Sequence, residues 1–175
     1  GNAQRVTVVD GRDARKALRF DGGGAIDVPK AKSLDPTGQS WTVEVVCKAE
    51  RPDGVLLARG GKTLGYALWL KDGRPAFSVN EGNKPVTVVA KRPIEGWVTV
   101  TGVIGVERKA KLFVNGILAG AAPLEDFIAR DPNDGMQIGA DLGSPVIEPP
   151  PPKFFGLIES VSVSSGDALA AQQAK

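Results

Sequence analysis

Apolar and polar residues alternate in short runs along most of this chain, and glycine or proline interrupts the runs at roughly ten-residue intervals. The sequence contains 22 glycines and 13 prolines. Alternation with a period of two is typical of half-buried β-strands. Apart from 167–175 and a short turn at 124–129, no segment keeps the period of a helix. The predicted strands are 16–20, 25–28, 41–48, 55–59, 66–70, 76–80, 86–91, 97–104, 111–115, 117–120, 136–140 and 156–163.

Two pairs of these strands are joined by an Asx-Gly dipeptide, Asp72-Gly73 and Asn115-Gly116. Such dipeptides supply the positive φ angles of tight β-hairpin turns. A dozen strands in one open sheet would leave a whole apolar face in water. The sequence therefore predicts an all-β fold, a two-sheet antiparallel β-sandwich of the jelly-roll kind.

The segment 41–48 shows which face is buried. Trp41, Val43, Val45 and Cys47 share one side, and mostly polar residues share the other. Residues i and i+2 of a strand point to the same face, so these four are predicted to lie in the core. Cys47 is the single cysteine, which excludes an internal disulfide, and a thiol in apolar surroundings is inert.

Length and composition indicate one domain covering residues 1–175, with 42% hydrophobic and 24% charged residues. Lysine and arginine total 22 against 20 aspartates and glutamates, and the basic residues are scattered, so we expect no nucleic-acid partner. The apolar runs are far shorter than the roughly 20 residues that span a bilayer, so we expect no membrane partner. Because the chain begins with Gly1 and not with Met, we expect it to be excised from a longer protein.

Acidic and amide side chains are concentrated in the stretch 130–145, which holds Asp131, Asn133, Asp134 and Asp141 around a short apolar strand. Three interpretations are open. Pro and Gly in this stretch suit an ordinary turn. Four oxygen-bearing side chains could instead contribute to a calcium site, although the spacing is not that of an EF-hand. Direct contact with a ligand is the third interpretation.

Aromatic side chains that remain accessible would be candidates for a sugar-binding surface. Tyr66 and Trp69 lie on opposite faces of one predicted strand, so one of them points away from the main core, and Trp69 is the first candidate. Trp97 opens a strand and is expected to anchor the core. Arg59 and Lys62, on either side of a Gly-Gly pair, are candidates for anion contacts.

Several segments resemble, in order and spacing, the laminin-G-like, concanavalin A-like jelly-roll domains: LRFDGGGAIDVP, WTVEVVCKAE, GYALWLKDGRPAFSV, GWVTVTGV, KLFVNGILAG, MQIGAD and FFGLIESVSV. The resemblance covers about 17–163 and implies a concanavalin A-like fold with that core. The stretch DPNDGMQIGADLGSPV with GYALWLKDG is more narrowly similar to the C-terminal module of bacterial arylsulfatases of planctomycete type. That similarity implies a secreted or periplasmic parent protein.

Catalysis by this chain is not expected. The sequence contains no histidine, which removes histidine-dependent acid-base chemistry and most zinc, iron and copper sites. Cys47 and Arg51 have the spacing of the motif by which sulfatases resemble one another, but Ala49 replaces its proline. The isolated acids Asp27 and Glu44 on predicted strands do not form the carboxylate pair of a jelly-roll glucanase.

The function expected from these observations is a non-catalytic accessory domain of an exported sulfatase or polysaccharide-processing protein, which binds carbohydrate, including sulfated glycans. The predicted ligand contacts are Trp69, Tyr66, Arg59 and Lys62. Calcium is the one cofactor considered, at Asp131, Asn133, Asp134 and Asp141. The alternatives are a structural or protein-interaction module that packs on a catalytic domain of the same polypeptide, and a jelly-roll glycoside hydrolase.

Overall fold

The computed structural model describes residues 2–82 and 84–167, with side chains from residue 5 onward. Within these residues the chain forms twelve β-strands and one short 3-10 helix, and contains no helix long and apolar enough to cross a membrane. The elements are β1 (Asn2–Asp10), β2 (Lys16–Val28), η1 (Lys32–Leu34), β3 (Trp41–Ala49), β4 (Gly54–Gly60), β5 (Leu64–Lys71), β6 (Arg74–Glu81), β7 (Pro85–Val89), β8 (Trp97–Ile104), β9 (Lys109–Val114), β10 (Ile117–Pro123), β11 (Met136–Ile138) and β12 (Phe155–Ser165).

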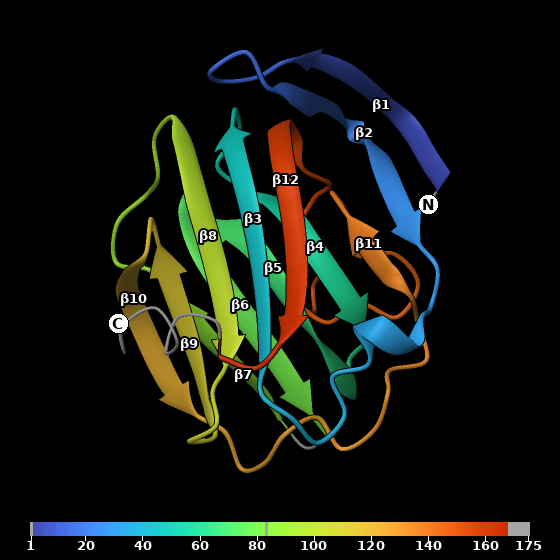
Figure 1. Ribbon diagram of the computed structural model, residues 1–175, viewed down its shortest axis with the longest axis vertical. Helices are drawn as coiled ribbons and strands as arrows, with labels where there is room; N and C mark the ends of the chain where they lie inside the picture. Colours follow the sequence, from blue (N-terminus) through green and yellow to red (C-terminus); the bar gives the residue numbers. More distant parts are fainter. Residues whose placement is uncertain (1, 83, 168–175) are drawn as a thin grey trace.

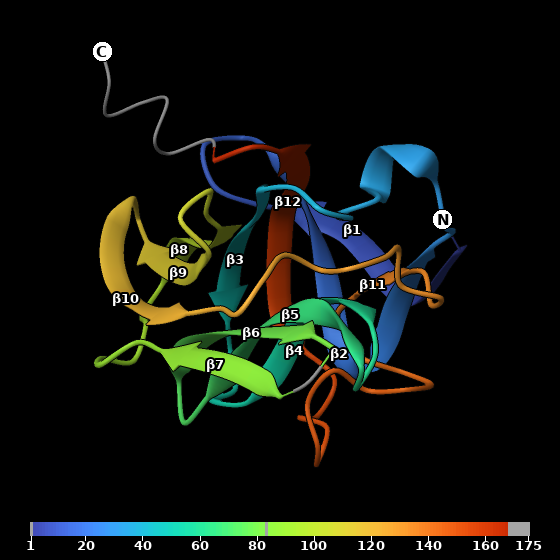
Figure 2. The same ribbon diagram turned by 90° about the horizontal axis from the view of Figure 1, so that it is seen from below.

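The strands form two layers that pack face to face (Figures 1 and 2). One layer has the order β10-β9-β8-β3-β12-β2, with β1 on the free edge of β2, and the other has the order β11-β4-β5-β6-β7. Hydrogen bonds between β2 and β11 join the layers on one side, and β10 lies against β7 on the other. The predicted all-β sandwich is confirmed, since neighbouring strands are antiparallel throughout.

Strand β2 connects the two layers. Its first half pairs with β12 through Leu18 and Phe20, and its last residues pair with β11 through Ile26 and Val28. The three glycines between the two halves allow the bend, and Gly22 has a φ of 78°. The segments 16–20 and 25–28, which the sequence predicts as separate strands, are therefore parts of one strand.

Both predicted hairpin turns are confirmed. Asp72 and Gly73 have φ angles of 52° and 76°, and Asn115 and Gly116 have φ angles of 50° and 76°. These angles match the tight turns that follow the right-handed twist of paired strands.

The main core fills the space between the layers. Trp41, Val43, Val45 and Cys47 all lie in it, as the alternation predicts. Burial raises the pKa of the Cys47 thiol to about 12, so the thiol stays protonated in the folded protein. At the corner near β2, Phe20 meets Phe154 edge to face, with ring centroids 6.0 Å apart.

A second apolar cluster lies on the outer face of β4, β5 and β6. Its members include Ala58, Ala67 and Trp69, and the loop at 139–154 covers them with Val146. Asn80 Nδ2 donates a hydrogen bond of 2.9 Å to the Val146 carbonyl. The outer face of this sheet is thus closed by a loop, and that loop also forms one wall of the site described below.

Three expectations from the sequence need correction. Strand β1 was not predicted, because Arg5 and other polar residues dilute its apolar alternation, and it is held by pairing with β2. Residues 124–129 form bends and no helix. Trp97 is half-buried on the outer face of β8, beneath Arg12, and not in the core. The helix considered at 167–175 lies, except for residue 167, outside the described residues.

Candidate functional site

The acidic stretch 130–145 crosses one end of the sandwich. Its short strand β11 lies between β2 and β4, with Met136 opposite both Val28 and Arg59. Because β11 is hydrogen-bonded on both edges, the loops before and after it start from fixed positions. Both loops line pockets.

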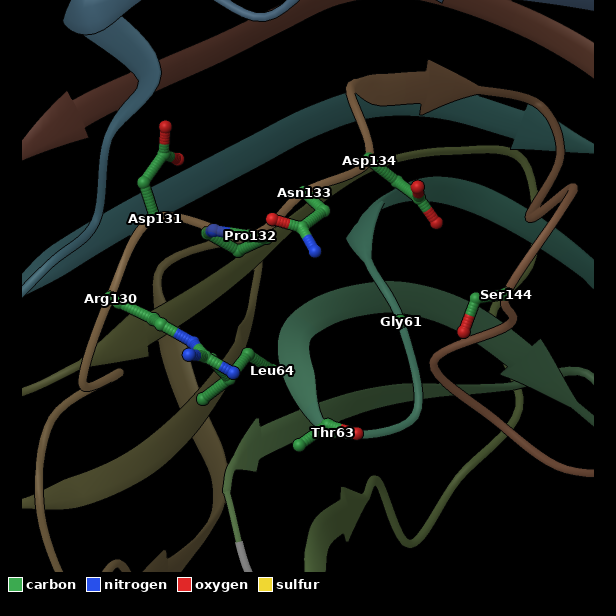
Figure 3. A pocket seen from close by; sticks show the side chains of 9 residues that line it. All are labelled: Gly61, Thr63, Leu64, Arg130, Asp131, Pro132, Asn133, Asp134 and Ser144. Atoms are coloured by element: carbon green, nitrogen blue, oxygen red, sulfur yellow. The ribbon is translucent and has the colours of Figure 1, made fainter.

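The first pocket has a volume of about 210 Å³ and lies between two chain segments (Figure 3). One wall is the turn from β4 to β5, with Thr63 and Leu64, and the other is the loop at 130–134. In Figure 3 the Arg130 side chain extends toward Leu64, and Ser144 enters from the loop after β11. The lining is mainly polar, with hydroxyl, amide, carboxylate and guanidinium groups.

The second pocket adjoins the first, has a volume of about 390 Å³ and shares Asn133 and Asp134 with it. Its other walls come from the end of β2, from β11 and from the loop after β11. These contribute Lys30, Gln137 and Asp141 to its lining. Asn133 and Asp134 form the partition between two neighbouring hollows, which we call the pocket pair.

The turn beside the first pocket depends on two glycines. A Cβ atom at Gly60 would lie 2.3 Å from the Leu64 carbonyl oxygen, and one at Gly61 would lie 2.4 Å from Ser144 Oγ. The first contact shapes the turn, and the second allows Ser144 to approach it closely. Asn80 Nδ2 also donates a hydrogen bond of 3.0 Å to the Gly61 carbonyl, which ties the turn to the loop after β11.

An ion pair with a buried arginine of β4 fixes the loop at 130–134. Arg59 on β4 is fully buried, and its Nη2 donates a hydrogen bond of 2.5 Å to Asp131 Oδ1. Lys30 Nζ lies 3.0 Å from the other carboxylate oxygen, on the solvent side. Asp131 therefore lies between two cations, and these ion pairs fix the position of the loop.

Asp141 anchors the loop after β11. Its Oδ2 accepts a hydrogen bond of 2.7 Å from the backbone N–H of Val146, and the side chain is buried. Burial raises the pKa of Asp141 to about 6, opposed by backbone hydrogen bonds from Val146 and Ile147 and assisted by the negative charge of Asp134. A fraction of the Asp141 carboxyl groups is therefore protonated near neutral pH.

The two aromatic residues expected to contact a sugar lie elsewhere. Tyr66 is fully buried in the main core, where its hydroxyl accepts a hydrogen bond of 3.0 Å from Trp41 Nε1. Trp69 does face away from the main core, as expected, but Val146 covers it and its Nε1 donates to Ser78 Oγ at 3.0 Å. Neither ring is open to a ligand, and among residues 2–82 and 84–167 no aromatic side chain lines the pocket pair.

The two cations expected to bind anions have different surroundings. Arg59 is buried and bonded to Asp131, so it does not face a ligand. Its Nε and Nη1 have no hydrogen-bond partner among the described residues. Lys62 is exposed in the turn between β4 and β5, beside the first pocket but not in its lining.

Two of the four residues expected to bind calcium are already held by other partners. Calcium requires about six to eight oxygen ligands around one point. Asp131 is held by Arg59 and Lys30, and Asp141 by the backbone of its own loop. Within residues 2–82 and 84–167 no group of three or more acidic, cysteine or histidine side chains is arranged to hold a metal ion.

Several residues of the pocket pair were not singled out from the sequence. Thr63, Ser144, Lys30 and Gln137 come from separate segments, and Arg130 stands at the start of the acidic stretch. A single polar residue in a loop carries no sequence signal of its own. The dense Asp and Asn stretch was the one available signal, and it did mark one wall of both pockets.

Residues 20–175 match the family model Laminin_G_3 of the concanavalin A-like lectin/glucanases superfamily. The chain belongs to this family. No curated protein matches the chain in sequence.

Solved structures with a similar fold include domains of three proteins. The CBM40 domain of the Ruminococcus gnavus IT-sialidase, bound to α2,3-sialyllactose, is 18% identical, with a TM-score of 0.63 over 86% of this chain and 95% of that chain. Domain 4 of AbnA, an extracellular GH43 arabinanase from Geobacillus stearothermophilus in complex with arabinotriose, is 17% identical, with a TM-score of 0.68 over 93% and 76%. The binding domain of Paraclostridial Mosquitocidal Protein 1 is 16% identical, with a TM-score of 0.67 over 94% of this chain, which spans 43% of that domain.

Proposed function

We propose that this chain is a non-catalytic, carbohydrate-binding accessory domain and that the pocket pair is its binding site. The observation that carries the proposal is the pair of adjoining polar hollows that share Asn133 and Asp134. The walls of these hollows are loops, which are fixed by the pairing of β11, by the Arg59–Asp131 ion pair and by the hydrogen bonds of Asn80. Fixed walls reduce the entropy that a ligand must lose on binding.

The chemistry of the lining suits sugar hydroxyls. Thr63, Ser144 and Asn133 offer both donors and acceptors, and the carboxylates offer acceptors, whereas the Gln137 amide is already hydrogen-bonded to Asp27 and to the Leu142 backbone. The larger hollow, about 390 Å³, lies within the usual range of small-ligand pockets, roughly 300–1,000 Å³. Recognition would depend on hydrogen bonds, because none of the described residues that line the two hollows has an aromatic ring.

The charge of the site favours neutral sugars. Four carboxylates line the hollows, from Asp27, Asp131, Asp134 and Asp141, against two lining cations, Lys30 and Arg130, while the buried Arg59 and the exposed Lys62 lie beside them. Asp131 is already neutralised by its partners, whereas Asp134 faces both hollows. A sulfate group would meet these carboxylates at short range, so a sulfated glycan is disfavoured here.

The comparisons support the proposal through the shared fold. The sialidase and arabinanase domains of similar fold are bound to sialyllactose and arabinotriose. We further propose that the domain belongs to an exported polysaccharide-processing protein, such as a sulfatase, where it would hold a catalytic domain close to its substrate.

Isothermal titration calorimetry with neutral, uronic and sulfated oligosaccharides tests the proposal. We expect a neutral oligosaccharide to bind, and Asn133→Ala with Thr63→Ala to weaken binding by about tenfold or more, since each removes a hydrogen bond to the ligand. Lys91→Ala, an exposed change remote from both hollows, is the matched control. Binding that both sets of variants leave unchanged would place the site elsewhere. No binding to any sugar would favour the structural or protein-interaction module.

One observation favours a second candidate, glycoside hydrolysis. Asp134 and Asp141 line the same hollow, and the pKa of Asp141 is raised to about 6, as general acids require. The hydrogen bond from Val146 to Asp141 opposes this role because it commits the carboxylate to the loop. Release of reducing ends from a bound oligosaccharide, abolished in Asp141→Asn, would establish hydrolysis, and no release would leave Asp141 as a loop anchor.

A further inference from the structure

The outer face of the layer opposite the second apolar cluster carries an arginine-rich aromatic surface. Strands β12, β3 and β8 run side by side at the front of Figure 1, with β2 beside β12. Arg19, Leu157, Lys48 and Trp97 stand directly opposite one another across these four strands. Paired residues of antiparallel strands share a face, and their chain neighbours Phe20, Cys47, Val98 and Ile158 lie in the core. The four therefore form one outward row, about 14 Å long at the usual strand spacing.

An arginine cluster surrounds the Trp97 end of this row. The Arg12 guanidinium carbon lies 5.9 Å from the centre of the Trp97 ring. Arg12 Nε also donates to both carboxylate oxygens of Glu159, at 3.1 and 3.2 Å, and Arg15 lies 3.4 Å from the same carboxylate. The side chain of Glu159 is only 4% exposed. One buried carboxylate thus holds two arginines, of which the Arg12 side chain is 35% exposed and the Arg15 side chain 69% exposed.

The other end of the row repeats the arrangement around Phe155. The Arg51 guanidinium carbon lies 4.2 Å from the centre of the Phe155 ring, and that of Arg19 lies 5.7 Å from it. Glu50 accepts two hydrogen bonds from Arg19, at 3.0 and 2.8 Å. Arg51 forms no ion pair within the described residues.

We call the row and its two arginine clusters the outer basic face. With Asp21, which stands opposite Phe155 and pairs with Arg5 at 3.2 Å, it contains six cations and three carboxylates, a net charge of +3, while the whole chain has a net charge of +2. The excess positive charge of the protein is therefore concentrated here. A second copy would present the same charges, so contact between two copies of this face is disfavoured.

We propose that the outer basic face docks an acidic segment of a partner protein, independently of the sugar site proposed above. An arginine stacked on a ring is held in place and still offers the N–H edge of its planar fork, which matches a carboxylate. Trp, Phe and Arg side chains together are typical of the centre of a protein interface. A sugar ring is a poor fit, because both aromatic rings are already covered by guanidinium groups.

The experiment measures fluorescence polarisation of a labelled oligoglutamate peptide with the whole chain. We expect saturable binding that weakens as salt is added. Replacing Arg12→Ala and Arg51→Ala together should weaken binding about tenfold or more, because each removes charge-assisted hydrogen bonds. The matched control is Lys91→Ala with Arg92→Ala, which removes the same charge from exposed residues elsewhere and should change affinity less than about twofold.

Two further measurements distinguish specific recognition by the guanidinium groups from non-specific electrostatic attraction. Arg12→Lys with Arg51→Lys keeps the charge but removes the forks, and should lose most of the affinity. Oligogalacturonate of matched charge should compete less well than the peptide. Equal weakening by the two alanine pairs, full affinity in the lysine pair, stronger competition by oligogalacturonate, or no peptide binding would each overturn the proposal.

Discussion

Removing the carboxylate of Asp131 should destabilise the fold far more than its position in a loop indicates. Arg59 is fully buried and has Asp131 as its hydrogen-bonded partner, while the Asp131 side chain is 23% exposed. Leaving one member of a buried ion pair alone typically costs about 3–5 kcal/mol. The pKa of Asp35 is lowered mainly by hydrogen bonds from Thr37 and to a smaller extent by the charge of Arg59, so a second carboxylate lies near this arginine. We therefore expect Asp131→Ala to reach the lower end, about 3 kcal/mol.

The assay is urea denaturation followed by tryptophan fluorescence, with thermal unfolding as a second measurement. For a chain of this length, about 3 kcal/mol corresponds to a midpoint lower by roughly 6–12 °C. Arg59→Met combined with Asp131→Ala should recover more than half of the lost stability, since the buried charge disappears with its partner.

The control is Asp10→Ala, which breaks an exposed pair with Lys16 and should stay within about 0.5 kcal/mol. A loss below about 1 kcal/mol for Asp131→Ala, or a double variant no more stable than the single one, would refute the reasoning.

Three further predictions concern other parts of the molecule. Gly102→Ala should cost about 1–3 kcal/mol in urea denaturation, because the new Cβ would lie 2.5 Å from the Phe77 ring, and a change under about 0.5 kcal/mol would contradict this. Cys47, with its pKa raised to about 12 by burial, should react with thiol reagents only as fast as the protein unfolds, whereas rapid labelling of folded protein would show an open site. The pKa of Asp141 is raised from 3.8 to about 6, so its protonation stabilises the fold: this contribution is complete below 3.8 and lost as pH rises through about 6. Denaturation of the native chain and of Asp141→Asn across that range should show the native chain losing stability relative to the variant, and parallel curves would count against the shift.

The periodic parts of the fold could be predicted from the sequence. The alternation from Trp41 to Cys47 identified core residues correctly, because both layers bury one face of each strand. The Asx-Gly turns were equally clear, since few residues tolerate positive φ. The bend in β2 was not predictable in this way, because the three glycines that allow it read as a break between strands.

The site could be predicted only in part. The Asp and Asn stretch is dense enough to attract notice, and it lines both hollows. Trp69 was correctly placed away from the main core, but whether its ring is open depends on Val146, which comes from a distant loop. Tyr66 and Arg59 lie opposite each other on neighbouring strands, and both point inward. Arg59 can be buried because Asp131 neutralises its charge, and strand periodicity does not predict that ion pair. Long-range packing of loops decided these cases.

The most direct test of the proposed function is an NMR titration of the isotopically labelled chain with neutral oligosaccharides. Binding at the pocket pair predicts amide shifts gathered at residues 60–64, 130–137 and 141–144, with little change along β3 and β12, and loss of these shifts in Asn133→Ala with Asp134→Ala. Shifts centred on the outer basic face, or none with any sugar while the chain remains folded, would contradict it.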